Sequence, residues 1–347
     1  MSKNIFFLYS ELSEYTVECL NFIVKNNRFK IYVFSWPVND EAPFKFNISK
    51  EIIIGDPDFL YEKSLEIKPE IIFCSGWLDK TYIKLIKSID YKCTKVLMVD
   101  NYWKDSIKQI LGRNVLKSVT KNFDLSWVPS NFHVSYSQKI GFKNKNIILG
   151  LYARDLSLFN EAFHNNKIKK SKNPPKKFIY VGRYLKLKGI LDLWNAFKIF
   201  SKTNSEWELH CVGTGYLSDK KMIHPKIFHH GFLSRDQILE LSSNTGIFVM
   251  PSHSDHWGMA VQEFACLGFP LICSNKVGSS YSFLEEGKNG FHFESKNIND
   301  LVRVMNKFSE MNNKELYKFA QRSNELSFLY NLETWNNTIL NITKFYD

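Results

Sequence analysis

The chain has 347 residues, of which 44% are hydrophobic, 15% aromatic and 23% charged. This length exceeds one ordinary core and predicts two domains of roughly 150–200 residues. The apolar content excludes an intrinsically disordered protein, and the 16 glycines and 10 prolines exclude a collagen-like or linker protein. We expect a folded protein with two cores.

The net charge is +11, and the positive excess is uneven along the chain. Residues 1–173 hold 26 basic and 18 acidic side chains, whereas residues 174–347 hold 20 and 17. A basic first half suits a phosphate-rich partner, either nucleic acid or an anionic membrane face. A composition rich in solvated lysines explains the same numbers, so both interpretations stay open.

The six cysteines form no C-x-x-C pair, and Cys74, Cys211 and Cys266 lie in apolar or helical stretches. They resemble small buried residues of a reducing compartment. The apolar run Ile5–Tyr9 is shorter than a signal-peptide core, and no run reaches the roughly eighteen residues of a membrane span. We expect a cytoplasmic protein.

Short β-branched and aromatic runs alternate with helical patterns, and several runs are continuously apolar, as in strands buried on both faces of a parallel sheet. The first series of predicted strands is Ile5–Tyr9, Lys30–Ser35, Glu51–Ile54, Glu70–Ser75, Lys95–Asp100, Leu125–Ser130 and Asn146–Gly150. The second series is Phe178–Gly182, Glu208–Gly213, Ile227–Phe232, Gly246–Ser252, Pro270–Asn275 and Gly290–Phe293. The fold class is therefore α/β, with two doubly wound, Rossmann-like parallel-sheet domains facing across a cleft.

Between the two series, residues 165–177 read NNKIKKSKNPPKK, and their lysines and prolines predict a linker. We expect an amino-terminal domain over residues 1–164 and a carboxy-terminal domain over residues 178–325. Residues 326–347 predict a helix with an apolar stripe. This helix either packs back on the first domain or ends the second.

Two segments carry residues suited to a phosphate ligand. In Phe178–Ile190 a buried strand ends at Gly182–Arg183, and a helix opens after Lys188–Gly189. A guanidinium fork and an ammonium beside a helix N-terminus suit a diphosphate, although basic loop residues are usually only solvated. In Gly246–Asn275 a polar loop opens into a helix at Gly258, and Glu263 lies among apolar neighbours. That carboxylate needs a partner, which a ribose diol would supply.

These segments resemble the signature regions of GT-B-fold, retaining glycosyltransferases of family 4 (GT4, group 1). Relatives carry two acids eight positions apart, here Asp255 and Glu263, and a basic donor-diphosphate corner. Further segments similar to family landmarks are Leu209–Gly215, Phe228–Ser234 and Ile148–Phe159. The resemblance covers about residues 146–295, while the preceding part is similar only in architecture.

The resemblance implies transfer of a sugar from a nucleotide-sugar donor to a saccharide or lipid-linked saccharide acceptor with retention of configuration. It also implies a role in cell-surface polysaccharide or glycoconjugate assembly, an acceptor-binding first domain, no cofactor and no obligatory metal. The implied catalytic residues are Arg183 and Lys188 at the diphosphate and Asp255 at the transferred sugar. The implied donor-binding residues are Gly182, Trp257, Gly258, Met259, Glu263 at the ribose and His230 along the base.

The sequence departs from the family pattern in two places. Asp255 stands where the family usually has glutamate, and Ser10–Glu14 lacks the paired glycines of many relatives. Ser13 is a candidate phosphate or sugar contact, and Asp100 is a candidate to orient sugar hydroxyls. A helix cap is the alternative role for each of them.

Other interpretations of the sequence stand beside this one. His253, Asp255 and His256 lack further ligands at a spacing suited to zinc. The basic amphipathic segment Trp103–Lys121 either contacts an anionic membrane or is a packed helix with a solvated lysine face. The rival functions are a nucleotide-sugar epimerase of the same fold and a non-catalytic basic protein that binds nucleic acid or membrane. Since no nucleic-acid-binding motif is recognisable, we expect no nucleic-acid partner.

Overall fold

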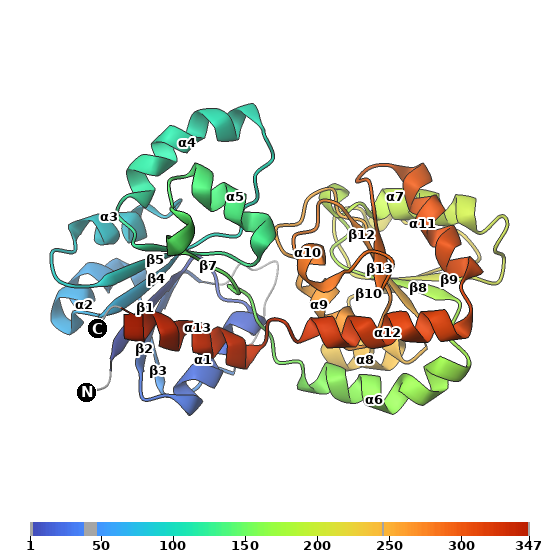
Figure 1. The fold of residues 1–347 in the computed structure, drawn as a ribbon, viewed down its shortest axis with the longest axis horizontal. Coiled ribbons are helices and arrows are strands. Elements are labelled where there is room, and N and C mark those ends of the chain that lie inside the picture. Colours follow the sequence, from blue (N-terminus) through green and yellow to red (C-terminus); the bar gives the residue numbers. More distant parts are fainter. Residues whose placement is uncertain (1–2, 38–46, 245, 346–347) are drawn as a thin grey trace. The chain divides into compact units, whose positions relative to one another are not determined.

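The computed structural model describes residues 3–37, 47–244 and 246–345, and the chain forms two compact units (Figure 1). Unit 1 comprises Met1–Asp155 and Tyr330–Asp347, and unit 2 comprises Leu156–Leu329. Each unit is built on one parallel sheet, as the continuous apolar runs predicted. Each unit therefore has its own sheet and its own hydrophobic core.

The sheet of unit 1 has seven strands in the order β3-β2-β1-β4-β5-β6-β7. Its strands are β1 (Asn4–Tyr9), β2 (Lys30–Ser35), β3 (Ile52–Gly55), β4 (Ile71–Ser75), β5 (Thr94–Met98), β6 (Leu125–Trp127) and β7 (Ile147–Ile148). Along β1, Ile5 and Phe7 enter one core, whereas Phe6 and Leu8 enter another on the opposite face. Both faces of the central strand are thus buried, which explains its unbroken apolar sequence.

Helices cover both faces of this sheet. They are α1 (Glu14–Asn26), α2 (Leu60–Ile67), α3 (Lys80–Ser88), α4 (Ile107–Thr120), α5 (Asn131–Lys139) and α13 (Leu332–Phe345). Helix α13, red in Figure 1, lies beside the blue α1 and adds Trp335 to the same core. The Trp335 indole donates a hydrogen bond to the Leu151 carbonyl at 3.0 Å. The carboxy-terminal helix therefore belongs to the first sheet, the first of its two expected placements.

The sheet of unit 2 has six strands in the order β10-β9-β8-β11-β12-β13. They are β8 (Lys177–Val181), β9 (Glu208–Val212), β10 (Ile227–Gly231), β11 (Ile247–Met250), β12 (Leu271–Ser274) and β13 (Gly290–Phe293). All thirteen predicted strands are present, with ends that differ by a few residues.

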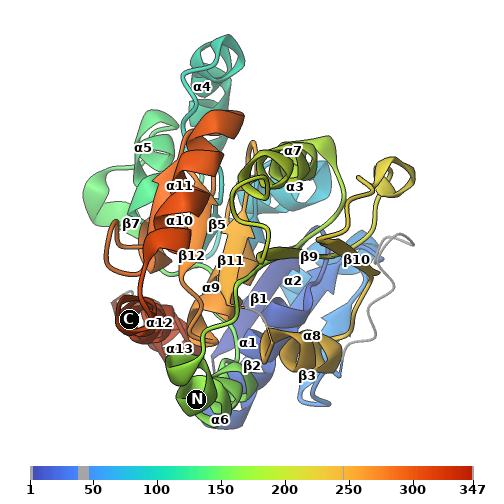
Figure 2. The same ribbon diagram turned by 90° about the vertical axis from the view of Figure 1, so that its right-hand side faces the viewer.

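The helices of unit 2 also form two layers around the sheet. They are α6 (Ser157–Lys172), α7 (Ile190–Phe200), α8 (Arg235–Ser242), α9 (Met259–Cys266), α10 (Ser280–Phe283), α11 (Ile298–Glu310) and α12 (Asn313–Ser327). Figure 2 shows α7 and α11 on one side of the sheet, with α6, α9 and α12 on the other. The short 3-10 helices of the chain are η1 (Pro57–Phe59), η2 (Asn144–Asn146), η3 (Lys186–Lys188) and η4 (Ser218–Lys220).

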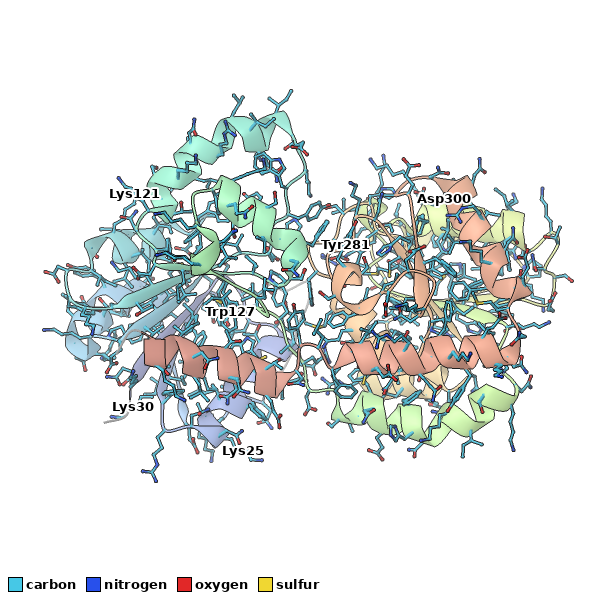
Figure 3. The ribbon with its side chains drawn as sticks, in the orientation of Figure 1. Lys25, Lys30, Lys121, Trp127, Tyr281 and Asp300 are labelled. Carbon is cyan, nitrogen blue, oxygen red and sulfur yellow. The ribbon has the colours of Figure 1, made fainter. Side chains whose placement is uncertain are left out.

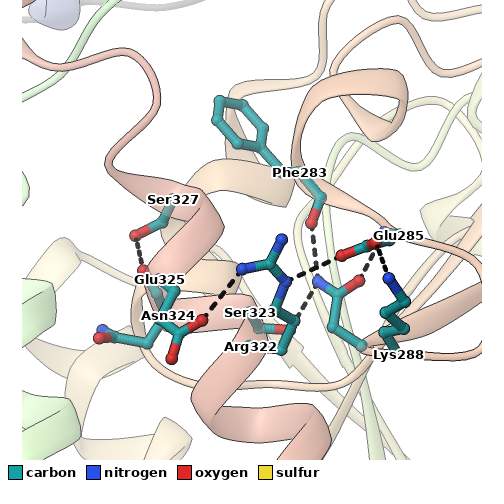
Figure 4. Close-up of polar contacts among 9 residues, drawn as sticks. Phe283, Glu285, Lys288, Arg322, Ser323, Asn324, Glu325 and Ser327 are labelled. Carbon is teal, nitrogen blue, oxygen red and sulfur yellow. Dashed lines mark hydrogen bonds and ion pairs between the residues drawn. The ribbon is translucent and has the colours of Figure 1, made fainter.

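A polar network ties α12 to the segment between α10 and β13 (Figure 4). The Arg322 guanidinium binds Glu285 at 2.9 Å. The buried Asn289 amide donates to the Phe283 carbonyl at 2.8 Å and to the Ser323 hydroxyl at 3.0 Å. Because α12 packs against α9, this network fixes the helix that carries Glu263.

The predicted linker is wrong over most of its length, because helix α6 runs to Lys172 and the units divide between Asp155 and Leu156. Lysine is a good helix former, and Phe159 and Phe163 supply the buried face that the lysine-rich end lacks. The prediction from composition was therefore wrong, because the lysine-rich segment is the solvated end of a helix. Over the described residues, no helix has the length and apolar content required to traverse a bilayer.

Candidate functional site

Two buried tyrosines hold the backbone at the corner between β8 and α7. The Tyr180 hydroxyl donates to the Arg183 carbonyl at 2.9 Å, and the Tyr184 hydroxyl donates to the Cys211 carbonyl at 3.1 Å. Burial raises the pKa of both phenols, so they remain neutral donors. Arg183 lies between them with an exposed side chain. The corner therefore presents a guanidinium from a fixed stretch of backbone.

Gly189 allows this corner to approach the end of β11 closely. Its φ is +69°, and a Cβ added there would lie 2.0 Å from the Pro251 carbonyl oxygen. Only glycine fits this position without moving the backbone. Gly182, at the end of β8, donates its N–H to the Val212 carbonyl at 3.0 Å, which continues the sheet into the corner.

Three contacts join this corner to the loop between β11 and α9, and we call them the corner clamp. Lys188 Nζ lies 2.6 Å from Asp255 Oδ2, with only 20% and 11% of the two side chains exposed. His253 Nε2 lies 2.7 Å from Asp192 Oδ2. The His253 N–H donates to the Leu187 carbonyl at 2.8 Å. Two segments more than sixty residues apart are thus fixed side by side.

Ser279 sets the direction of the helix opening at Gly258. Its N–H donates to the Trp257 carbonyl and its hydroxyl to the Gly258 carbonyl, both at 2.9 Å. Gly258 has a φ of +88°, and α9 begins at the next residue, Met259. The first N–H groups of a helix have no partner within the helix and favour an anion or a hydroxyl oxygen.

Glu263 lies one helical turn after Met259 and is half-buried. Side chains on a helix lean toward its N-terminus, so the Glu263 carboxylate lies on the same side of α9 as the opening turn. The helix therefore places an acid beside the start of a positive dipole. That arrangement suits a ligand with hydroxyl groups close to an anionic group.

His230 lies on the edge strand β10, and its ring stacks on that of His210 with centroids 5.2 Å apart. His230 Nε2 is 3.0 Å from His210 Nδ1, and His210 Nε2 is 3.2 Å from Glu208. Burial lowers the pKa of His230, and the electrostatic effect of the neighbouring His229 lowers it further. These contacts occupy the His230 ring. Phe232, which follows the end of β10, is 72% exposed.

In unit 1, Asp100 and Ser13 both line one cavity of about 420 Å³ at the carboxyl ends of β1, β4 and β5. The Tyr152 hydroxyl donates to Asp100 Oδ2 at 3.0 Å. Ser13 also caps α1, because its hydroxyl accepts the Thr16 N–H at 3.4 Å. Asp100 does not cap the helix that follows it, since the cap of α4 is Ser106.

The sequence analysis did not identify two residues that contribute to these sites. Asp192 is one, because nothing in its own segment indicates a histidine 61 positions later. Tyr152 is the other, because no local pattern indicates that its hydroxyl binds Asp100, 52 positions earlier. His253 and Asp255, considered for zinc, bind the corner instead. In the described ranges no group of three or more His, Cys, Asp or Glu side chains is placed to hold a metal ion.

Comparison with known proteins agrees with this architecture. Residues 162–325 match the family model "Glycosyl transferases group 1". An uncharacterized glycosyltransferase of Haemophilus influenzae is 25% identical over 198 residues, 55% of this chain and 53% of the relative. Lipopolysaccharide 1,6-galactosyltransferase of Salmonella typhimurium is 25% identical over 190 residues, 51% and 52% of the two chains. The chain thus spans about half the length of these curated relatives.

Among solved structures, Anabaena HepE in complex with UDP superposes with a TM-score of 0.76 at 14% identity, covering 99% of this chain and 100% of that one. At this identity the likeness establishes the fold. The fold is GT-B, with two Rossmann-like units, and residues 162–325 are similar to the group 1 glycosyltransferases.

The corner clamp predicts energetic coupling between Lys188 and Asp255. Lys188→Met or Asp255→Asn alone should lower the free energy of unfolding by about 1–3 kcal/mol, since each strands a largely buried partner. The double variant should cost less than the sum by about 1 kcal/mol or more, measured by urea denaturation. The same cycle on the pair Lys176–Glu206, whose side chains are 60% and 50% exposed, serves as the control and should couple by under about 0.5 kcal/mol. Equal coupling in the two cycles would contradict the clamp.

Proposed function

We propose that this protein transfers a sugar from a nucleotide-sugar donor to a saccharide or lipid-linked saccharide acceptor. The observation that carries the proposal is the corner of unit 2, where an exposed Arg183 precedes Lys188 by five positions and Lys188 is bound to Asp255 in the loop before α9. The family model over this unit supports it, and so does the UDP bound by HepE. Such a corner supplies the positive groups that a departing nucleoside diphosphate needs.

In the proposed reaction the bond between the anomeric carbon and the diphosphate oxygen breaks. Arg183 and Lys188 stabilise the charge that develops on the leaving diphosphate, and Glu263 holds the ribose hydroxyls. Asp255 contributes by fixing Lys188, its partner at 2.6 Å. The N–H groups of Trp257, Gly258 and Met259 and the backbone of Gly182 complete the donor site, with His230 toward the base. We propose retention of configuration, as in GT4 enzymes, with no cofactor or obligatory metal.

The acceptor is assigned to unit 1, where Asp100 and Ser13 share a cavity at the ends of the strands. A role in cell-surface polysaccharide or glycoconjugate assembly is supported by the name of the Salmonella relative. We place the enzyme in the cytoplasm, which agrees with the free state of Cys19, Cys74, Cys93, Cys211, Cys266 and Cys273.

The donor site can be tested by substitution. Arg183→Ala should lower kcat/KM at least about 100-fold, because it removes a donor aimed at the leaving group. Glu263→Gln should weaken donor binding about tenfold or more through loss of a charged hydrogen-bond acceptor. Substrate consumption would be followed with the nucleotide-sugar that most raises the melting temperature among UDP-, GDP-, ADP- and CMP-linked sugars.

The matched control is Arg303→Ala, which removes an exposed arginine on α11 that pairs with Asp300. It should leave activity unchanged. Full activity of Arg183→Ala, or the lack of stabilisation by any nucleotide-sugar, would overturn the proposed function. The anomeric configuration of the product, determined by NMR, tests retention separately.

We also propose that helix α4 rests on an anionic membrane. Its outer face carries Ile107, Leu111 and Val115, which are 76%, 72% and 69% exposed and recur at every fourth residue. Figure 1 places α4 at the rim of unit 1, outside α5. Exposed cations accompany this stripe, namely Lys104, Lys108, Arg113, Lys117 and, after the helix end, Lys121 (Figure 3). Apolar and basic side chains on one solvent-facing helix suit an anionic lipid surface.

The membrane proposal predicts binding to vesicles of phosphatidylglycerol and phosphatidylcholine, but not of phosphatidylcholine alone. Each cation near the surface contributes about 1 kcal/mol, so binding should weaken as salt is added. Leu111→Asp with Val115→Asp should reduce co-sedimentation at least about tenfold. Ile168→Asp, at a residue of α6 that is 64% exposed, is the control and should bind normally. Unchanged binding of the α4 variant would contradict the proposal.

A further inference from the structure

A second cavity of unit 1, which we call the amino-edge cavity, lies at the opposite edge of the sheet from Asp100 and Ser13. Its volume is about 490 Å³, within the range of small-molecule sites. It is lined by Leu125, Lys145, Asn146, Ile148, Thr338, Asn341 and Ile342. Leu125 opens β6 and Asn146 immediately precedes β7, so the cavity lies at the amino ends of these parallel strands, beside α13. Among the described residues that line it, none belongs to the proposed donor or acceptor site.

The floor of the amino-edge cavity is aliphatic. Leu125 and Ile342 are 4% and 3% exposed and belong to the core beneath α13, and Ile148 packs against the same core. The described lining residues include no aromatic side chain, so the floor offers no ring on which a base or a sugar could stack. Water leaves an aliphatic surface of this kind favourably when a hydrocarbon chain covers it.

Two polar side chains in the wall already have partners within the protein. The Asn146 amide donates to the Asp124 carbonyl at 3.0 Å. The Thr338 hydroxyl donates to the Thr334 carbonyl, one turn earlier in α13, at 2.9 Å. Because these donors are satisfied internally, this part of the wall does not need hydrogen bonds from a ligand.

The rim of the cavity is cationic. Lys145 and Asn341 are exposed, and over the described part of the chain Lys145 makes no ion pair. Exposed Lys143 and Lys344 lie two positions from lining residues. One acid, Asp124, precedes Leu125, and its carboxylate accepts a backbone N–H of β5 at 2.8 Å. An ammonium and an amide above an aliphatic floor suit a ligand with an anionic end and a hydrocarbon end.

We infer that the amino-edge cavity binds an aliphatic chain that carries an anionic head group. The chain covers Leu125, Ile148 and Ile342, and the head group binds Lys145 and Asn341. Two sources supply such a ligand, a free fatty acid and an anionic membrane lipid, and the chemistry of recognition is the same for both. The inference goes beyond sugar transfer, and it requires neither a working donor site nor contact of α4 with a membrane.

The test is isothermal titration calorimetry of the full chain with single-chain probes below their micelle concentrations. The probes are octanoate, decanoate, decanol and decyltrimethylammonium. Decanoate should bind about tenfold more tightly than octanoate, because two more methylene groups leave water. It should also bind at least about tenfold more tightly than decyltrimethylammonium, whose head group Lys145 repels.

Two variants separate the contribution of the chain from that of the head group. Lys145→Met should weaken decanoate binding about fivefold while leaving decanol binding within about twofold, because it removes the charge and keeps an apolar stem. Asn341→Trp should weaken both probes at least about tenfold, because the indole fills the opening. The matched control is Asn337→Trp, at an exposed asparagine of α13 that does not line the cavity, and it should bind both probes normally.

The absence of saturable decanoate binding, equal binding of decyltrimethylammonium, or unchanged decanoate binding in Lys145→Met would overturn the inference. Equal weakening by the Asn341→Trp and Asn337→Trp variants would also overturn it. Dodecanoate and lauroyl lysophosphatidylglycerol, whose chains are equally long, distinguish the two sources. Tighter binding of the lysolipid assigns the cavity to an anionic lipid, and tighter binding of dodecanoate assigns it to a free fatty acid. Because no probe contains a nucleotide or a sugar, failure here is distinct from failure of the proposed function.

Discussion

The corner clamp is the constraint on which the proposed donor site depends. Strands β8 and β11 are neighbours and parallel, so the loops that follow them leave the same edge of the sheet. Lys188 with Asp255 and Asp192 with His253 then fix those loops to one another. Without this fixation, the guanidinium of Arg183 and the opening of α9 would not keep a constant separation. Preorganised positive groups stabilise developing charge because they need no rearrangement during the reaction.

The two units present side chains of different chemistry. Unit 2 presents cationic side chains and a helix N-terminus, which suit phosphate groups. The cavity of unit 1 presents carboxylates and tyrosines, which suit hydroxyl groups. Asp255, which stands where the family usually has the longer glutamate, binds Lys188 through its carboxylate.

Sequence patterns predicted most of the fold, because strands buried on both faces must be apolar throughout, as Ile5–Leu8 are. The prediction of a linker failed because the lysine-rich end of α6 is held in the helix by the packing of Phe159 and Phe163, which lie nearer the start of that helix. For the proposed site, a resemblance indicated Arg183, Lys188, Asp255 and Glu263, and the structure brings Lys188 and Asp255 into contact. The contact between His253 and Asp192 could not be predicted from the sequence. It depends on two segments that approach each other only in the folded chain.

The most direct measurement of the central claim is a crystal structure of the full chain with the nucleoside diphosphate that stabilises it most. The account predicts phosphate oxygens within hydrogen-bonding distance of the Arg183 guanidinium and Lys188 Nζ, with the ribose hydroxyls on Glu263. A nucleotide bound elsewhere, with those three side chains making no contact to it, would contradict the account.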